Sequence, residues 1–419
     1  MNPWPVIGAA LRRYRFTALV FVLLVGAGVA LSVAILSQER ALRTGSARAA
    51  DRFDLVVAAP GSQTDALLTA VYLQPGAVRL LAPEITAALL NDDRAAFVSP
   101  LAFGDSLRGS PIVGAIPALV AHLSDGLAEG RVFASRAEAV IGAASPLRLG
   151  DRFRPTHGVH ALAETADEHD GHEAEEGHAD HGEADGHDTE LTVIGRMKPT
   201  GSPWDRAIVV PVELVWAVHG LPDGHAEGEA RIGPPFDQAR TPGIPAAVLH
   251  ARDVAGAYRL RQAYATDGSM AFFPAEALIK LYGILGDLRR LMALLAIVTQ
   301  ALVLLALVAS VVILLRLLMP QFVTLRALGA PRRYVFAVAW GFTAALVAAG
   351  VLLGLAGGWA LSFAISRALA AQTGVALQPT LGVAELWVAL AVLLIGFALA
   401  ALPAWLIQRR PLAEALAGE

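Results

Sequence analysis

The sequence has 419 residues, of which 55% belong to the apolar set AVILMFWYC and only 17% are charged. Soluble globular chains carry about a quarter charged residues, so this composition excludes most soluble classes of protein. The chain has no cysteine, which excludes thiol catalysis, disulfide cross-links and cysteine-ligated zinc. The net charge is −4, yet residues 164–190 hold twelve acidic residues and no lysine or arginine, so the rest of the chain sums to +8.

Four uncharged stretches are long enough to cross a bilayer, which takes about 20 apolar residues. They are residues 16–36, 291–315, 334–366 and 386–408. The first is too long for the apolar core of a cleaved signal peptide, so we interpret it as a retained anchor. The third is longer than one span needs, which predicts a tilted helix or an interfacial continuation.

Basic residues predict the orientation of these spans. Arginines precede the first span, lie at or between the second and third, and follow the fourth: Arg12, Arg13, Arg15, Arg316, Arg326, Arg332, Arg333, Arg409 and Arg410. The positive-inside rule places both termini and the 316–333 loop in the cytoplasm, and residues 37–290 outside. Loop arginines set the orientation of the spans in any membrane protein, so these arginines do not by themselves indicate a partner.

The external region alternates short β-rich runs with helical patterns, which predicts a mixed α+β domain. The fold class is therefore an integral membrane α-helical protein, with four transmembrane helices and an α+β domain inserted between helices 1 and 2. A seam of leucines leads into the second span, at Leu278, Leu281, Leu285 and Leu288. This heptad spacing predicts either a rigid stalk with a helix–helix contact or one amphipathic helix on its own domain.

The third span carries Gly350, Gly354 and Gly358, a doubled GxxxG that lets helices approach closely in lipid. This face would serve either a subunit interface or packing within one chain. No span carries an Asp, Glu or Lys deep in the hydrocarbon, which disfavours an ion channel or secondary transporter. The chain also lacks a phosphate-binding G-x-x-x-x-G-K-[ST] loop, so it is not an ATPase itself.

Several segments in order resemble the FtsX/MacB-like permeases of ABC transporters. The external domain has Gly130-Arg131, then 138–142, 149–153 and 193–195, followed by Thr200-Gly201-Ser202 and Asp205. After the second span comes a similar cytoplasmic loop, Thr324, Leu325, Arg326, Ala327, Leu328, Gly329 and Ala330. After the fourth span, Pro403-Ala404 and Pro411 with Ala415-Leu416 resemble the family's C-terminal signature. The resemblance covers nearly the whole chain.

The resemblance implies a non-catalytic permease subunit in the bacterial inner membrane. In that family the 324–330 loop docks on a separate LolD/MacB-like ATPase, two permease subunits pair, and stalk helices pass motion to a periplasmic domain. We expect a homodimer, a lipid bilayer, a periplasmic metal-binding or effector partner, and no nucleic acid. The implied segments are 1–37 (N-terminus and first span), 38–273 (periplasmic domain), 274–319 (stalk and second span), 320–333 (coupling loop), 334–366 (third span), 367–385 (periplasmic loop), 386–408 (fourth span) and 409–419 (C-terminus).

Residues 157–190 interrupt the family pattern with a His/Asp/Glu-rich insert. Seven of the eleven histidines lie here: His157, His160, His169, His172, His178, His181 and His187. Imidazole is a common ligand of zinc and copper, with carboxylates as co-ligands. The insert has no cysteine or methionine, which disfavours Cu(I), so zinc leads while nickel and Cu(II) stay open. A solvated linker that binds metal only incidentally is the alternative.

The insert also resembles that of FtsX-like permeases encoded in zinc-responsive operons. We therefore predict a permease linked to zinc handling or uptake, with zinc bound at the insert and no intrinsic cofactor otherwise. Two alternatives stay open. One is extraction or efflux of lipoproteins or other amphiphiles, as in Lol-type permeases, and the other is a cargo-free regulator of a cell-wall hydrolase.

Overall fold

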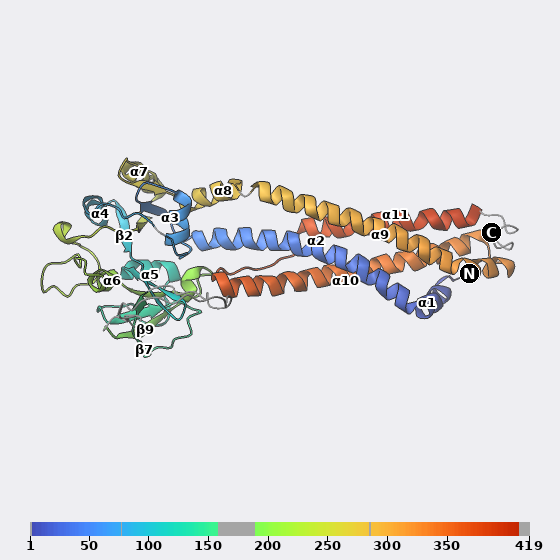
Figure 1. The fold of residues 1–419 in the computed structure, drawn as a ribbon, viewed down its shortest axis with the longest axis horizontal. Coiled ribbons are helices and arrows are strands. Elements are labelled where there is room, and N and C mark those ends of the chain that lie inside the picture. Colours follow the sequence, from blue (N-terminus) through green and yellow to red (C-terminus); the bar gives the residue numbers. More distant parts are fainter. Residues whose placement is uncertain (1, 77, 158–188, 285, 410–419) are drawn as a thin grey trace, which may run out of the picture. The chain divides into compact units, whose positions relative to one another are not determined.

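The computed structural model describes residues 2–76, 78–157, 189–284 and 286–409 (Figure 1). The chain forms two compact units. The membrane unit holds Met1–Thr44, Leu285–Ala370 and Leu377–Glu419, and the soluble unit holds Gly45–Ile284 and Ala371–Ala376.

The membrane unit is built from helices. They are α1 (Trp4–Arg13), α2 (Arg15–Ala50), α9 (Gly286–Ala327), α10 (Arg332–Thr373) and α11 (Val383–Arg409). Helix α1 was not predicted from the sequence, because its ten residues are too few to give a span signal. Its first turn contains proline and its last turn holds Arg12 and Arg13, as is favourable at helix starts and ends.

Three helices within the described residues are long and apolar enough to cross a membrane. These segments are Arg15–Ala50, Arg332–Thr373 and Val383–Ala401, with mean hydropathies of 2.8, 2.1 and 2.4. They include the first and third predicted spans in full and most of the fourth. The second predicted span, residues 291–315, lies in helix α9, and many of its side chains fall outside the described part of the chain. The count of four spans therefore stays a prediction.

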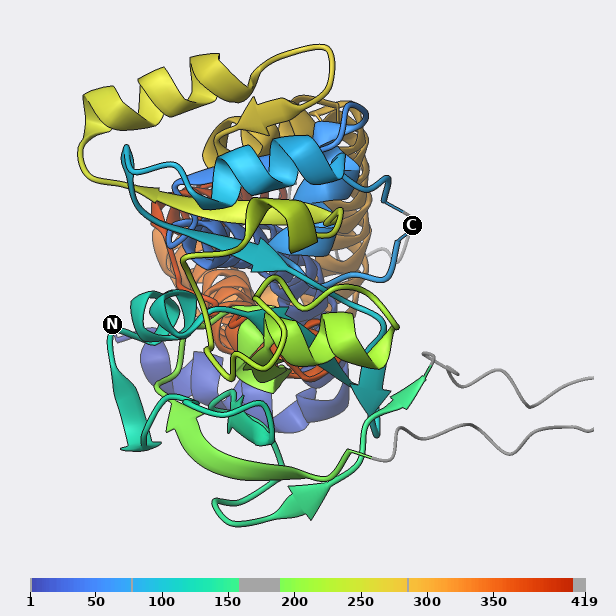
Figure 2. The same ribbon diagram turned by 90° about the vertical axis from the view of Figure 1, so that its left-hand side faces the viewer.

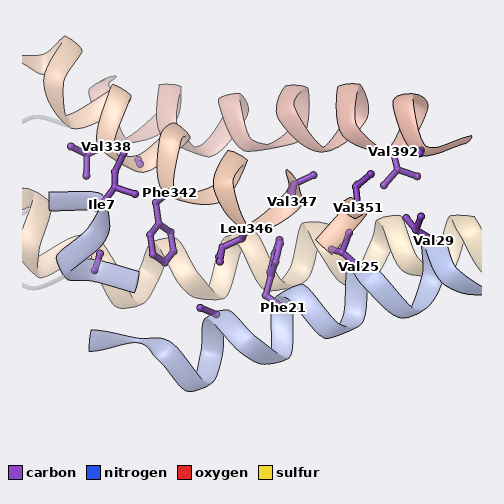
Figure 3. Close-up of a cluster of buried hydrophobic side chains, with 14 of the residues drawn as sticks. Ile7, Phe21, Val25, Val29, Val338, Phe342, Leu346, Val347, Val351 and Val392 are labelled. Atoms are coloured by element: carbon purple, nitrogen blue, oxygen red, sulfur yellow. The ribbon is translucent and has the colours of Figure 1, made fainter. Parts of the chain in front are cut away.

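A cluster of buried aliphatic and aromatic side chains joins helices α1, α2, α10 and α11 (Figure 3). Phe21, Val25 and Val29 of α2 lie with Phe342 and Val351 of α10 in this cluster. Lipid tails are as apolar as these side chains, so close packing rather than the exclusion of water holds such helices together. The shape of the facing helix surfaces therefore decides which helices pair.

The glycines of α10 lie against α2 of the same chain. A Cβ atom added at Gly350 would lie 2.8 Å from Cβ of Val25, and one at Gly354 would lie 2.6 Å from Cβ of Val29. A Cβ atom at Gly358 would lie 2.7 Å from Cβ of Val33. Of the two roles left open for this face, the structure shows the second, packing within one chain.

The soluble unit contains two β-sheets (Figure 2). The first is antiparallel, in the order β12-β1-β11-β2, and the second is mixed, in the order β5-β9-β6-β10-β4-β3-β8, with β7 paired to β9. The strands are β1 (Leu55–Ala58), β2 (Ala95–Leu101), β3 (Asp105–Leu107), β4 (Ser110–Ala115), β5 (Leu127–Gly130), β6 (Glu138–Ile141), β7 (Arg152–Phe153), β8 (Thr156–His157), β9 (Leu191–Met197), β10 (Ile208–Pro211), β11 (Ala246–Ala251) and β12 (Met270–Phe272).

Short helices cover these sheets. They are α3 (Gln63–Ala70), α4 (Pro83–Leu90), α5 (Pro117–Ser124), α6 (Val212–Val218), α7 (Val254–Tyr264) and α8 (Pro274–Ile284), with 3₁₀ turns η1 (Pro203–Arg206) and η2 (Gln238–Arg240). Helices α3, α5 and α7 contact the first sheet, and α6 contacts β4 and β10 of the second. The predicted fold class, an α-helical membrane protein with an α+β domain inserted after the first span, is confirmed.

Candidate functional sites

The predicted coupling loop, residues 324–330, consists of the last turn of α9 and a tight turn into α10. The backbone N–H groups of Leu328, Gly329 and Ala330 donate to carbonyl oxygens of Thr324, Arg326 and Leu325, each at 3.0 Å. Gly329 has φ of 89°, the left-handed conformation with which helices commonly end. The turn is thus held by its own hydrogen bonds.

The turn presents a large apolar side chain, Leu328, on a basic surface. Leu325 and Ala330 pack against the buried cluster of the membrane unit, whereas Leu328 is 80% exposed. Arg332 and Arg333, at the start of α10, are also exposed. An exposed leucine on an ordered turn, flanked by cations, is suited to insertion into an apolar groove with an acidic rim.

A polar network links α2, α10 and α11 within the membrane unit. Glu385, which is fully buried, accepts hydrogen bonds from the Arg40 guanidinium at 2.8 Å and from the Gly382 N–H at 2.9 Å. Arg40 also donates to the carbonyl oxygen of Thr380 at 2.9 Å. Ser362 of α10 donates to the Ser37 hydroxyl at 3.2 Å. The sequence analysis did not predict this network. The feature that could have indicated it is the carboxylate of Glu385 at the start of an apolar span.

The histidine-rich insert begins at strand β8. His157 ends this strand and pairs in register with Asp105 of β3. The other predicted metal ligands, His160, His169, His172, His178, His181 and His187, lie outside the described residues. Among the residues that the structure does describe, no group of three His, Cys, Asp or Glu side chains is placed to hold a metal ion.

Two histidines outside the insert lie together in the soluble unit. The rings of His122 and His250 have centroids 4.2 Å apart, and Nδ1 of His250 lies 2.7 Å from Oδ2 of Asp54. Burial and, to a smaller extent, the neighbouring His250 lower the pKa of His122. The sequence did not predict this contact, because residues so far apart in the chain give no local sign of it.

A second buried pair ties helix α6 to the loop that follows it. Oε1 of Glu213 accepts a hydrogen bond from the Gly233 N–H at 2.6 Å and lies 3.4 Å from Nε2 of His225. Both side chains are almost fully buried. Burial raises the pKa of Glu213. His225 also stacks on Phe236, so this pair organises the loop and does not open to a substrate.

The predicted stalk lies in two described helices. Leu278 is buried and Leu281 half-buried in α8, which ends at Ile284. Helix α9 begins at Gly286, and residue 285 and the side chain of Leu288 lie outside the described part. One continuous helix through this seam stays a prediction.

Residues 293–412 match the family described as FtsX-like permease C-terminal. The matched segment begins within α9 and includes α10, α11 and the turn at Leu328. No curated protein matches the chain.

Proposed function

We propose a function that starts from the match of residues 293–412 to the FtsX-like permease C-terminal family, whose members are non-catalytic membrane subunits that pair with an ABC ATPase. The chain acts as an FtsX/MacB-type permease of a bacterial inner membrane, with the soluble unit in the periplasm. A LolD/MacB-like ATPase hydrolyses ATP, and two copies of the chain pair. The family match over residues 293–412 is the observation that carries this proposal.

The turn around Leu328 supports the coupling step. Its hydrogen bonds and the packing of Leu325 and Ala330 on the buried cluster make the turn continuous with α9 and α10. A push on Leu328 is therefore passed to both helices rather than absorbed by a loose loop. The face of α10 with Gly350, Gly354 and Gly358 is occupied by α2, so two copies would pair through another surface.

The test of coupling replaces the exposed leucine by a charge. Leu328→Asp should abolish stable co-purification of the ATPase and its stimulation by the permease, because central apolar anchors contribute about 2 kcal/mol or more to an interface. Leu381→Asp, at another exposed leucine of the membrane unit (46% exposed), is the matched control and should retain both. Full ATPase binding by Leu328→Asp would refute the proposed docking role.

A link to zinc is the second part of the proposal, and the composition of the insert supports it. Seven histidines among twelve acidic residues form a high local concentration of nitrogen and oxygen ligands. The insert would capture or sense zinc in the periplasm, and ATP-driven motion of the soluble unit would pass the ion or the signal to a partner protein.

The zinc link is tested in cells that carry the wild-type chain, a chain without residues 158–188, or a chain with a Gly/Ser linker of equal length there. Total cell zinc and growth with a zinc chelator should fall in both variants if the insert takes part. Equal zinc and growth in all strains would separate the permease from zinc handling.

An apolar cavity in the soluble unit favours one of the alternatives, handling of amphiphiles. The cavity has a volume of about 490 Å³, and Leu73, Phe103 and Trp216 are among its walls. Lipoproteins retained in the inner membrane after deletion of the permease, with normal cell zinc, would favour this second function.

A further inference from the structure

An apolar groove lies between α1, α10 and α11 of the membrane unit. It has a volume of about 360 Å³, and Trp4, Ile7, Trp340 and Phe397 are among its walls. Every residue that lines it is Pro, Trp, Ile, Ala, Gly or Phe. The indole N–H of Trp340 already donates to the carbonyl oxygen of Phe397, at 3.1 Å. The groove is therefore suited to an apolar ligand.

Helix α1 forms one wall of the groove because it is fixed on α10. A Cβ atom added at Gly341 would lie 2.8 Å from Cδ1 of Ile7, and Ile7 belongs to the buried cluster (Figure 3). The hydroxyl of Tyr334 donates to the carbonyl oxygen of Asn2 at 3.3 Å, just before α1 begins. These contacts keep Trp4 at the groove, although its side chain is 66% exposed. Tryptophan is enriched at the interface between membrane and water, which is where this end of the groove is expected to lie.

The groove follows α10 over a length similar to that of one lipid leaflet. Its walls on this helix extend from Ala337 to Ala348. At a rise of 1.5 Å per residue this segment is about 16 Å long. The hydrocarbon core of a bilayer is about 30 Å thick, so one leaflet takes up about 15 Å. Since α10 is long and apolar enough to cross a membrane, the groove has the length of an acyl chain in one leaflet.

A cation lies at the end of the groove that is nearest the start of α10. Arg333 precedes Ala337 by four residues, so the two lie on the same face of the helix. Arg333 is exposed, and its guanidinium forms no ion pair or hydrogen bond within the part of the chain that the structure describes. The positive-inside rule places this end of α10 at the cytoplasm. Guanidinium groups bind phosphate oxygens through paired hydrogen bonds, and basic pockets between cytoplasmic helix ends bind anionic lipid headgroups.

We propose that the groove binds one anionic phospholipid of the cytoplasmic leaflet, with an acyl chain along Ala344 and Ala348 and the phosphate at Arg333. Lipid that surrounds the helices gives no hydrophobic gain, so the fit of the chain and the ion pair hold this molecule in place. The site goes beyond the proposed function, because it requires only that α10 crosses a membrane with its start at the cytoplasm. It depends on neither the ATPase nor zinc.

The experiment counts the lipids that the full chain retains in detergent micelles. The protein is titrated with phosphatidylglycerol or with phosphatidylcholine and analysed by native mass spectrometry. We expect about one tightly bound phosphatidylglycerol per chain and weaker retention of phosphatidylcholine. Arg333→Gln should weaken phosphatidylglycerol binding by about fivefold, as expected for one cation near a membrane surface. Arg333→Lys keeps the charge and should retain most of the binding.

The matched control for the charge is Arg332→Gln. It removes the same charge at the neighbouring position, on another face of α10. Arg332 is exposed to water, which screens its charge, so this variant should change phosphatidylglycerol binding by less than about twofold.

A second pair of variants tests the groove itself. Ala348 lines the groove, whereas Ala349 is exposed and is not among its walls. Ala348→Phe should weaken retention of phosphatidylglycerol by about tenfold or more, because a filled groove loses the van der Waals contacts with the chain. Ala349→Phe should leave retention unchanged. Thermal unfolding checks the fold of each variant, and the exposed Arg333 tests the site even where Ala348→Phe does not assemble.

Equal retention of the two lipids by the wild-type chain, or unchanged phosphatidylglycerol binding in Arg333→Gln, would overturn the proposal. A second copy of the chain is the competing occupant of the groove. Because the chain has no cysteine, Ala345→Cys places a single thiol at the groove. Rapid disulfide cross-linking of two copies through it would show that a second copy lies there and would also overturn the proposal. Failure of the lipid site leaves the proposed function standing, since ATPase binding and cell zinc are measured separately.

Discussion

In the membrane unit α10 meets α2 through glycines, with a Val or a backbone carbonyl where each missing side chain would lie. In the soluble unit the strands are joined by backbone hydrogen bonds, and their interior holds large side chains such as Trp204 and Trp216. The difference follows from the solvent that each unit displaces. In lipid the association of helices brings no hydrophobic gain, so the free energy of association depends mainly on how closely the helices approach. In water the burial of a large apolar area stabilises the fold through the hydrophobic effect.

Among the described residues, each unit has a glutamate with no exposed surface, and the two glutamates have different partners. Glu385 in the membrane unit pairs with the guanidinium of Arg40, while Glu213 in the soluble unit has a backbone N–H and a histidine. Both side chains are fully buried. A buried charge is tolerated only when its partners replace water. Substitutions at these two glutamates therefore measure how much the stability of each unit depends on those partners.

The largest expected effect comes from filling the glycine face. Gly354→Val places carbon atoms where Cβ of Val29 and the carbonyl oxygen of Gly26 lie, 2.6 and 2.7 Å from the added Cβ. We expect a loss of about 3 kcal/mol or failure to assemble, since overpacking forces the helices apart. Heating in detergent followed by size-exclusion chromatography would show it.

Gly357→Val is the matched control in the same helix. A Cβ atom at Gly357 meets nothing closer than Cβ of Ala30 at 3.9 Å, so this variant should behave as wild type. If both variants lost stability equally, helix propensity rather than close approach to α2 would govern the membrane unit.

The second effect concerns Glu213 in the soluble unit. Glu213→Ala removes the acceptor of the Gly233 N–H and the neighbour of His225, and should destabilise the unit by about 2–3 kcal/mol. Glu213→Gln retains an acceptor oxygen and should cost less. Denaturant unfolding, monitored by tryptophan fluorescence, would measure the loss of stability in both variants, because Trp216 lies in the same helix.

The pH dependence gives Glu213 a second readout. Burial raises its pKa, so its folded form favours the proton, and the stability this provides is present at low pH and falls as the pH rises through the raised pKa. Glu213→Gln cannot ionise and should flatten this slope. An unchanged slope in Glu213→Gln would mean that another group titrates there.

The third effect tests the buried carboxylate of the membrane unit. Glu385→Ala removes the acceptor for Arg40 and for the Gly382 N–H, and should cost about 1–2 kcal/mol. The expected loss is smaller than at Glu213 because the Arg40 side chain is 31% exposed and retains its bond to Thr380. Glu385→Gln, which keeps an acceptor, should recover most of the thermal stability lost in Glu385→Ala. If Glu385→Ala lost more stability than Glu213→Ala, the membrane unit would depend on its buried carboxylate more than the soluble unit does, contrary to this expectation.

What the sequence predicted follows from local signals. Apolar runs of 20 or more residues identified helices, and β-rich runs at Leu191 and Ile208 became strands β9 and β10. The family resemblance also rested on short local motifs, and the match over residues 293–412 supports its permease part.

What the sequence did not predict depends on distant partners. The spacing of Gly350 and Gly354 identified a packing face but not α2 as its partner, because that choice depends on the shape of the facing helix. The contact of His122 with His250 and the register of Asp105 with His157 follow from sheet topology, which no local pattern encodes. Candidate functional residues of the soluble unit therefore emerged only from the fold.

The smallest expected effect lies in the soluble unit at the ion pair of Asp92 and Arg94, in which the Asp92 side chain is 5% exposed and that of Arg94 is 51% exposed. The guanidinium of Arg94, and to a lesser extent the hydroxyl of Tyr264, lower the pKa of Asp92 to about 2. A lowered pKa contributes stability above the ordinary value near 4, and this contribution is lost as the pH falls toward 2. Arg94 is half exposed, so solvent screening reduces the contribution to about 0.5–1 kcal/mol.

Asp92→Asn should therefore lower stability slightly at pH 6 and remove part of the decline between pH 5 and pH 3, measured by denaturant unfolding at each pH. Asp93→Asn, at the exposed neighbouring position, is the control and should leave both unchanged. Because the pair is screened by water, added salt should also shrink the Asp92 effect, whereas the Glu213 effect should resist salt. Equal salt sensitivity at both sites would show that water reaches the buried pair as readily as the surface one.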